Sequence, residues 1–147
     1  MKIVSIVGAQ DSGKTVLVER LVRHFARAGL RVGTVKHAHG GFDVPGSDSH
    51  RHFRAGADVT VLVGPEAAAT FRRGAPGFPR RELRGMDVVL VEGFSRLPMR
   101  RIEVVGRGPR RRVKADAIVS ASALGARVPV FRPREIARIA RFILERP

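Results

Sequence analysis

The stretch Gly8-Ala9-Gln10-Asp11-Ser12-Gly13-Lys14-Thr15 decides the fold of this 147-residue chain. It fits the phosphate-binding loop pattern G-x-x-x-x-G-K-[ST] without a mismatch. In such a loop the glycines let backbone N–H groups point at phosphate oxygens, the lysine neutralises the β- and γ-phosphates, and the last hydroxyl is a Mg²⁺ ligand. The candidate nucleotide-binding residues are therefore Gly8, Asp11, Ser12, Gly13, Lys14 and Thr15, and the candidate metal ligand among them is Thr15.

The residues on either side of the loop have the pattern that this mechanism needs. The segment 3–7 is apolar and β-branched apart from Ser5, which is typical of a strand buried on both faces of a parallel sheet. After the loop, apolar side chains recur at helical spacing, at Val18, Leu21, Val22 and Phe25. This spacing predicts a helix that starts near residue 14 and ends before residue 29, a glycine.

The rest of the chain alternates between strand-like and helix-like segments. Apolar runs predict strands over 31–36, 58–63 and 87–91, and weaker ones over 67–71, 101–105 and 117–120. A short helix capped by Ser47 or Asp48 is expected to end near residue 56. A final helix is expected to have Pro133 in its first turn and an apolar stripe of Ile136, Ile139, Ala140 and Ile143. The pattern predicts an α/β fold: one P-loop NTPase domain over 1–147, with a mostly parallel sheet and helices on both faces.

Composition excludes several classes of protein. The chain is 44% hydrophobic and has no apolar run long enough to span a membrane, so we expect a globular domain without a membrane segment. It contains no cysteine, which excludes disulfides, Fe–S clusters and thiolate zinc sites. A targeting segment is not recognisable at the N-terminus, which favours a cytoplasmic location.

The formal net charge of +15 raises the question of nucleic-acid binding. Almost all of the 28 basic residues are arginines spread along the chain, a distribution that favours a compositionally biased, solvated surface over a dedicated polyanion site. The densest basic patch, over 107–114, lies in a loop by its Gly and Pro content. Nucleic acid is therefore not the expected partner, although the alternative stays open.

A P-loop site also needs an acid at the end of a neighbouring strand. The run 88–91 is apolar, with Asp87 before it and Glu92 after it. Ligands of open α/β sheets bind at the carboxyl ends of strands, so we choose Glu92 as a catalytic acid and Mg²⁺-shell residue. The alternative is that Glu92 merely caps a loop.

Histidines and acids cluster in the sequence after the second predicted strand: His37, His39, Asp43, Asp48, His50 and His52. The two His-x-His pairs are compatible with a transition-metal site, but residues two apart on a helix do not face each other. We favour a site in which Lys36, His37 and His39 face phosphate or another anion. In this interpretation Asp43 reaches the Mg²⁺ shell as a switch residue.

Four motifs in order resemble the molybdopterin-guanine dinucleotide biosynthesis adaptor family, the MobB type of P-loop NTPase. They are GAQDSGKT at 8–15, VKHAHGGFDVPGSDS at 35–49, RAGA at 54–57 and LVEGF at 90–94. They cover about the first two thirds of the chain. The block after the second strand is much more particular to this family than the phosphate-binding loop, which many families share.

The resemblance implies a cytoplasmic, homodimeric GTP-binding protein with weak Mg²⁺-dependent GTPase activity. Its partners would be the molybdenum cofactor guanylyltransferase, which joins GMP to molybdopterin, and molybdopterin itself. Carried over residue by residue, Gly13, Lys14 and Thr15 contact nucleotide and Mg²⁺. The catalytic and metal-shell acids are Asp43 and Glu92, and the same site includes Lys36 and His37.

The residues alone leave the nucleobase and the reaction open. The chain contains no Asn, so the guanine motif N-K-x-D is impossible, and the preference for GTP over ATP comes from the resemblance. One alternative is a small-molecule or nucleoside kinase, with the segment 64–85 as an arginine-rich lid. The other is a nucleic-acid-stimulated ATPase module, which the charge alone favours.

Overall fold

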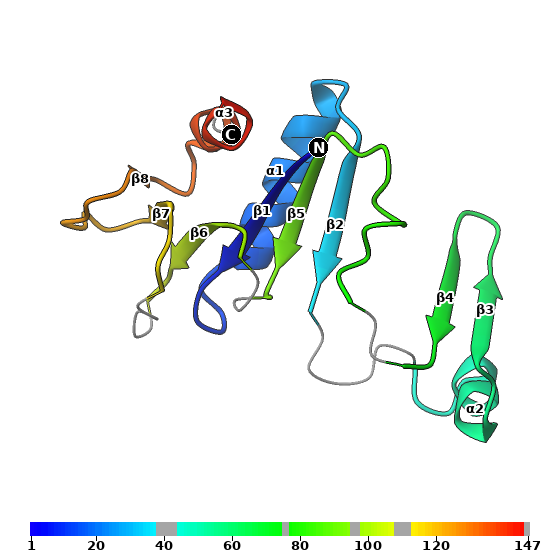
Figure 1. Cartoon of the computed structure of the whole chain (residues 1–147). Helices are drawn as coiled ribbons and strands as arrows, with labels where there is room; N and C mark the ends of the chain where they lie inside the picture. Colours follow the sequence, from blue (N-terminus) through cyan, green and yellow to red (C-terminus); the bar gives the residue numbers. More distant parts are fainter. Residues whose placement is uncertain (38–43, 75–76, 95–97, 108–112, 146–147) are drawn as a thin grey trace. The chain divides into compact units, whose positions relative to one another are not determined.

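The computed structural model describes residues 1–37, 44–74, 77–94, 98–107 and 113–145 (Figure 1). The chain divides into two compact units. The first unit comprises residues 1–37 together with 80–147, and the second comprises residues 38–79. The second unit is therefore inserted in the sequence between two strands of the first.

The first unit is built on a six-stranded sheet in the order β2-β5-β1-β6-β7-β8. All neighbouring strands in it are parallel. The strands are β1 (Lys2–Val7), β2 (Val32–Lys36), β5 (Val88–Glu92), β6 (Arg100–Val105), β7 (Ala117–Ser120) and β8 (Val130–Phe131). The mostly parallel sheet of the sequence analysis is confirmed, and β8, with two residues, is an addition that no sequence pattern predicted.

Helices α1 (Lys14–Arg27) and α3 (Ile136–Glu145) pack on the same face of this sheet. Leu21 and Phe25 of α1 and Ile139 and Ile143 of α3 are buried in one cluster with alternate residues of the strands. The predicted helical stripes are confirmed, with Leu17 buried more deeply than Val18. Pro133 precedes α3 by three residues and lies in a turn, not in the helix itself.

The second face of the sheet carries irregular chain in the described part of this unit. Gly33 pairs in register with Val89, and a Cβ added at Gly33 would lie 2.7 Å from Leu83 Cδ2 and 3.1 Å from Met86 Cγ. The segment 80–86 therefore covers β2 and β5 on the face opposite α1 and α3, whereas the sequence analysis expected helices on both faces of the sheet. Glycine and proline at positions 74, 77, 79 and 85 explain the difference, because both residue types disfavour a helix.

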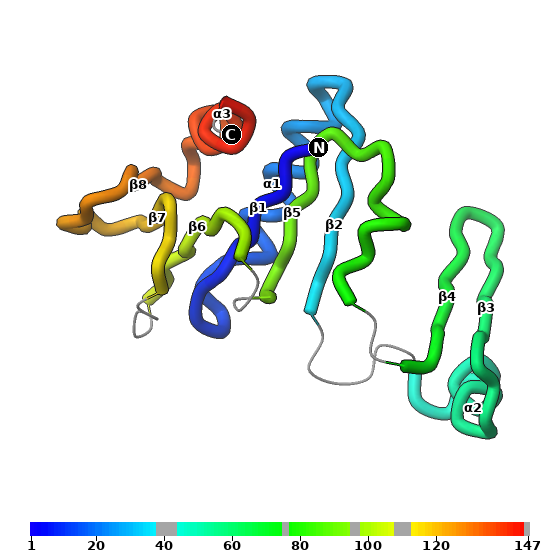
Figure 2. Tube along the Cα trace, viewed as in Figure 1, coloured from blue at the N-terminus to red at the C-terminus, as the bar shows by residue number. Residues whose placement is uncertain are grey.

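The second unit consists of α2 (Asp48–Ala55) and an antiparallel hairpin of β3 (Val59–Val63) and β4 (Ala68–Arg72) (Figure 2). Ser47 caps α2 as predicted, accepting a hydrogen bond from the backbone N–H of His50 at 3.2 Å. Both strands were predicted, but they pair with each other and not with the main sheet. No helix in the described residues of either unit is long and apolar enough to cross a membrane.

Candidate functional site

The phosphate-binding loop connects the carboxyl end of β1 to the first turn of α1. Gly13 is the N-cap of α1, with φ at +94°, and no side chain caps the helix. The first turn contains no acid and does contain Lys14. A positive side chain at the positive end of the helix dipole is unfavourable by itself, so this helix start favours an anion.

Lys14 and Asp11 take different positions in the loop. Lys14 Nζ donates a hydrogen bond to the carbonyl oxygen of Ala9 at 2.5 Å, so its charge lies over the loop. Asp11 has a left-handed backbone conformation, with φ at +55°, and is exposed. Asp11, one of the predicted nucleotide-binding residues, therefore lies at the surface of the loop.

The loop packs directly against the end of β6, and two glycines make the close approach possible. A Cβ at Gly8 would lie 2.4 Å from the carbonyl oxygen of Val104, and a Cβ at Gly106 would lie 2.7 Å from Ser12 Cα. Both distances are too short for any side chain. The sequence analysis did not single out Gly106, although its position directly after an apolar strand was a signal.

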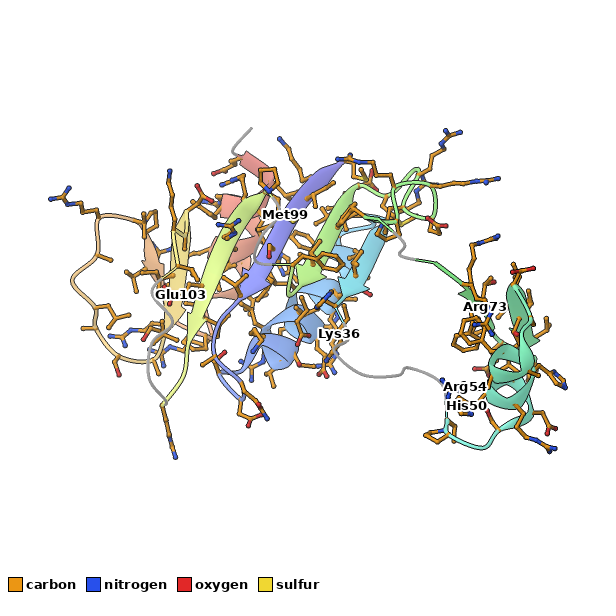
Figure 3. All side chains as sticks on the ribbon, turned by 60° about the horizontal axis from the view of Figure 1, so that its bottom comes forward. Lys36, His50, Arg54, Arg73, Met99 and Glu103 are labelled. Atoms are coloured by element: carbon orange, nitrogen blue, oxygen red, sulfur yellow. The ribbon has the colours of Figure 1, made fainter. Side chains whose placement is uncertain are left out.

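Thr15, Glu92 and Lys36 come together at the carboxyl ends of β2 and β5. Thr15 Oγ1 donates to the Glu92 carboxylate, at 3.2 Å from Oε1 and 3.3 Å from Oε2. Lys36 Nζ lies 3.5 Å from Glu92 Oε1. Figure 3 labels Lys36 at this end of the sheet. The Glu92 side chain is only 15% exposed, against 66% for Lys36.

The two acids Asp87 and Glu92 lie at opposite ends of β5 and have different contacts. Asp87, at the amino end, accepts a hydrogen bond from the backbone N–H of Arg31 at 2.7 Å and so links β5 to the start of β2. Glu92 is the acid at the carboxyl end, within reach of the P-loop threonine. Of the two acids, the structure places Glu92 beside the loop.

The Thr15 hydroxyl and the Glu92 carboxylate have the chemistry that Mg²⁺ needs. Both are hard oxygen donors, and they lie within hydrogen-bond distance of each other. Mg²⁺ is commonly held by one or two protein oxygens, with phosphates and water as its other ligands. Asp43, the other predicted metal-shell acid, lies outside the described residues.

His37 is held beside Glu92 by its backbone and by its ring. Its N–H donates to the carbonyl oxygen of Glu92 at 2.9 Å. Its ring meets the ring of Phe94 edge to face, with centroids 4.8 Å apart. These contacts fix the position of His37 at the rim of the site, while its predicted contact with phosphate stays a prediction.

The other histidines give no support to the transition-metal interpretation. His50 and His52 belong to α2, and His50 Nδ1 accepts a hydrogen bond from the backbone of Gly46 at 3.2 Å. Across the described ranges, no three His, Asp or Glu side chains are grouped so that they could hold a metal ion. His39 lies outside those ranges.

A cavity of about 470 Å³ opens on the other side of the loop, at the carboxyl ends of β6 and β7. Its walls include residues of the loop and of α1, the ends of the two strands, and the segment 119–122. Ser12 Oγ is buried and has no hydrogen-bond partner in the described structure. The sequence analysis missed this cavity, because most of its walls come from the ends of β6 and β7 and the segments after them, which carry no recognisable motif.

The family model of molybdopterin guanine dinucleotide synthesis protein B matches residues 3–123. The chain is 34% identical over 111 residues to a protein of Bacillus subtilis (strain 168) described as a probable molybdopterin-guanine dinucleotide biosynthesis adapter protein. It is 28% identical over 106 residues to a putative adapter protein of the same description in Methanocaldococcus jannaschii. These matches cover 70% and 65% of this chain, but only 64% and 42% of the relatives, less than two thirds of each.

Solved structures support the same comparison. A crystal structure of a molybdopterin-guanine biosynthesis protein B superposes with a TM-score of 0.75 and 33% sequence identity. The superposition covers 97% of both chains. The similarity therefore includes the second unit and the residues after 123, which the family model does not match.

Proposed function

The chain belongs to the molybdopterin guanine dinucleotide synthesis protein B family, MobB, and on this basis we propose that it is a GTP-binding adapter with weak Mg²⁺-dependent GTPase activity. It assists a molybdenum cofactor guanylyltransferase in joining GMP to molybdopterin, and molybdopterin is a further partner. Family membership favours this function over the kinase and the nucleic-acid-stimulated ATPase. Nucleic acid is not among the proposed partners.

The observation that carries the proposal is the position of Thr15 and Glu92. An intact phosphate-binding loop places its threonine 3.2 Å from an acid at the end of the neighbouring strand. A glycine turn without a ligand has no need of an acid there, whereas a Mg²⁺-nucleotide site does.

The backbone of the loop and the side chains of Lys14 and Thr15 bind different parts of the Mg²⁺-nucleotide. The backbone N–H groups of 8–15 and the start of α1 bind the phosphate oxygens. Lys14 exchanges the carbonyl oxygen of Ala9 for phosphate oxygens. Thr15 and Glu92 hold Mg²⁺, which neutralises charge on the phosphates when it is bound.

Lys36 and His37 complete the rim on the β2 side. Lys36 lies at salt-bridge distance from Glu92 and is largely exposed, so it can turn toward a phosphate while staying close to the acid. His37 contributes its ring at the same strand end, and Asp43 contributes a second carboxylate from the segment after β2. Glu92 and Asp43 align water for hydrolysis.

Slow hydrolysis follows from what the site lacks in the described residues. Fast phosphoryl transfer needs a cation on the charge that develops in the transition state. Among the described residues, the hydrogen bonds and ion pairs of Thr15, Glu92 and Lys36 include no arginine side chain. A partner supplies this group in the proposed scheme, as expected for an adapter.

The proposal also covers the organisation of the whole protein. Residues 1–147 are one P-loop domain in which the second unit is an insertion, since β2 and β5 pair directly across it. The protein is a homodimer, which helps to shield the nucleotide from water. A cytoplasmic location belongs to the same proposal, because the function needs a compartment that supplies GTP and Mg²⁺.

Titration calorimetry with GTP and with ATP, each with and without Mg²⁺, tests the proposed function. We expect GTP to bind more tightly than ATP, and Mg²⁺ to strengthen the binding. Failure of both nucleotides to bind in the presence of Mg²⁺ contradicts the proposal. Tighter binding of ATP than of GTP contradicts the assignment of the base.

A further inference from the structure

We propose that the cavity between the loop and the ends of β6 and β7 binds a 6-oxopurine nucleoside and recognises the base without contacting its 2-amino group. The inference rests on the proposed nucleotide binding and assigns the part of the site that recognises the base. It concerns the first unit alone, and all residues involved belong to that unit.

The order of the strands gives the direction of the nucleotide. Glu92 and Lys36 lie on β5 and β2, on one side of β1, while the cavity lies at the ends of β6 and β7, on the other side. A triphosphate on the loop whose terminal phosphate is near Mg²⁺ on the Glu92 side therefore extends its sugar and base toward the cavity. Ser12, Gly13 and Val16 belong both to the loop region and to the cavity wall.

The size and walls of the cavity suit a nucleoside. Ligand cavities commonly have volumes of about 300–1,000 Å³, and this one has about 470 Å³. Buried Leu17, Val104 and Val119 form an apolar floor, and Val16 on the rim is 50% exposed. Such walls bury the faces of a flat base, while the exposed Ser122 offers its hydroxyl as a polar contact.

The charged groups of the cavity decide which base fits. Its charged side chains are Arg20 and Arg107, and its lining contains neither Asp nor Glu. Arg20 donates to the carbonyl oxygen of Pro133 at 3.4 Å, whereas Arg107 has no hydrogen bond or ion pair among the contacts of the described residues. Arginine is well suited to the adjacent O6 and N7 acceptors of a 6-oxopurine.

The same charges argue against recognition of the 2-amino group. The N1–H and 2-amino donors of guanine are best met by a carboxylate, which this cavity does not offer among its described side chains. Inosine and guanosine share O6 and N7, and only guanosine has the 2-amino group. Adenosine presents a donor in place of O6, so it loses the contact with arginine.

The first experiment separates the loop from the cavity by comparing inorganic tripolyphosphate with GTP, both with Mg²⁺. Ala121 lines the cavity and is exposed, so Ala121→Phe fills the cavity without entering the core. We expect Ala121→Phe to weaken GTP binding by about tenfold or more while leaving tripolyphosphate binding within about twofold of the parent. Ala126→Phe, at an exposed position outside the cavity lining, is the matched control. It should change neither the affinity for GTP nor the affinity for tripolyphosphate.

The second experiment compares GTP, ITP and ATP on the parent and on Arg107→Ala. We expect ITP to bind within about fivefold of GTP, and ATP at least about tenfold more weakly than GTP. Arg107→Ala should remove most of the difference between GTP and ATP. Arg127→Ala, a change at another exposed arginine, should preserve the difference.

The results distinguish this inference from the proposed function. If the parent binds tripolyphosphate and GTP equally, or Ala121→Phe binds GTP like the parent, the cavity does not hold the nucleoside even though the loop binds phosphate. If ITP binds more than about fivefold more weakly than GTP, the 2-amino group is recognised and the mode of recognition is wrong. If the parent binds neither ligand, the proposed nucleotide binding itself fails.

Discussion

Lys14 carries the positive charge of the phosphate-binding loop, and its contact with the carbonyl oxygen of Ala9 is one that a phosphate oxygen can replace. We expect Lys14→Ala to abolish Mg²⁺-nucleotide binding and to leave the thermal unfolding midpoint nearly unchanged, because the side chain is not part of the core. Titration calorimetry and circular dichroism check the two parts. Affinity within about threefold of the parent is incompatible with a phosphate-binding role for this loop.

Glu92 acts on hydrolysis more than on binding in the proposed scheme. Glu92→Gln keeps the shape of the side chain and removes its charge, so alignment of water in the transition state suffers more than ground-state affinity. We expect slower single-turnover GTP hydrolysis with nucleotide affinity largely retained, and the same for Asp43→Asn.

The hydrolysis measurement has two outcomes that count against this assignment. A parent rate above about 1 per second, within the usual range for enzymes, contradicts the weak activity. Unchanged rates in both variants show that neither acid contributes to hydrolysis. Asp87→Asn is a suitable control, since Asp87 lies at the opposite end of β5 and bonds the backbone of Arg31.

Gly106 lies directly against the loop, and its lack of a side chain leaves room for the backbone of Ser12. A Cβ at this position would lie 2.7 Å from Ser12 Cα, a backbone atom that can move only together with the loop. Gly106→Ala should therefore weaken nucleotide binding by about tenfold or more, as measured by calorimetry. Gly125→Ala is the matched control, because a Cβ there meets no atom within 4 Å, and equal affinities for the two variants would show that the loop tolerates the displacement.

The sequence predicted the residues whose role follows from a local motif. The positions of the loop and of Glu92 at one edge of the sheet could be predicted, because a phosphate-binding loop and the end of an apolar strand are visible in consecutive residues. Gly106 and the cavity residue Ala121 were missed, because their role depends on contact with segments about 100 residues away in the chain. Such contacts leave no periodic pattern in the sequence.

The contribution of helix α3 to the stability of the core can be tested with two single substitutions. Ile139 is fully buried between the helix and the sheet, whereas Leu144 on the same helix is 38% exposed. Ile139→Ala should lower the free energy of unfolding by about 2–5 kcal/mol, since it leaves a cavity in the core. Chemical denaturation checks this value, and Leu144→Ala should cost clearly less. Similar losses for both variants would show that α3 does not contribute its apolar stripe to this core.

Sequence patterns predicted whether a segment is a helix or a strand better than they predicted which strands pair with each other. The strands over 59–63 and 68–72 were expected from their composition, yet nothing in that composition distinguishes a hairpin from two strands of the main sheet. Helices α1 and α3 were predicted from apolar stripes, but a stripe does not specify which face of a sheet it covers. That choice depends on the order of the strands, which the sequence patterns leave open.

The whole molecule is expected to be a dimer, and the hairpin of the second unit offers a surface for it. Val61, Leu62 and Val63 of β3 are 56%, 52% and 76% exposed, and a two-stranded hairpin alone is only marginally stable in water. Light scattering at a protein concentration of roughly tens of micromolar should give twice the mass of one chain. Val61→Lys combined with Val63→Lys should reduce the mass to that of one chain.

A control variant and two outcomes decide the prediction of a dimer through the hairpin. Lysine at Val44, which is 70% exposed and lies outside the hairpin, should leave the mass unchanged. A parent of monomeric mass, with and without GTP, rules out the homodimer. A dimeric double variant places the interface elsewhere on the chain.

Because β1 lies between β5 and β6, it leaves the ribosome well before either of the strands with which it pairs. The hydrogen bond from Ser5 to Gly93 joins residues 88 apart in the chain. At the usual rates of synthesis, β1 remains unpaired for about 5 to 20 seconds. During this time α1 can form locally, but its apolar stripe has no sheet to cover. The nascent chain therefore presents an unpaired apolar strand and a bare helix face to chaperones, and its yield in cells should fall as the temperature of expression rises.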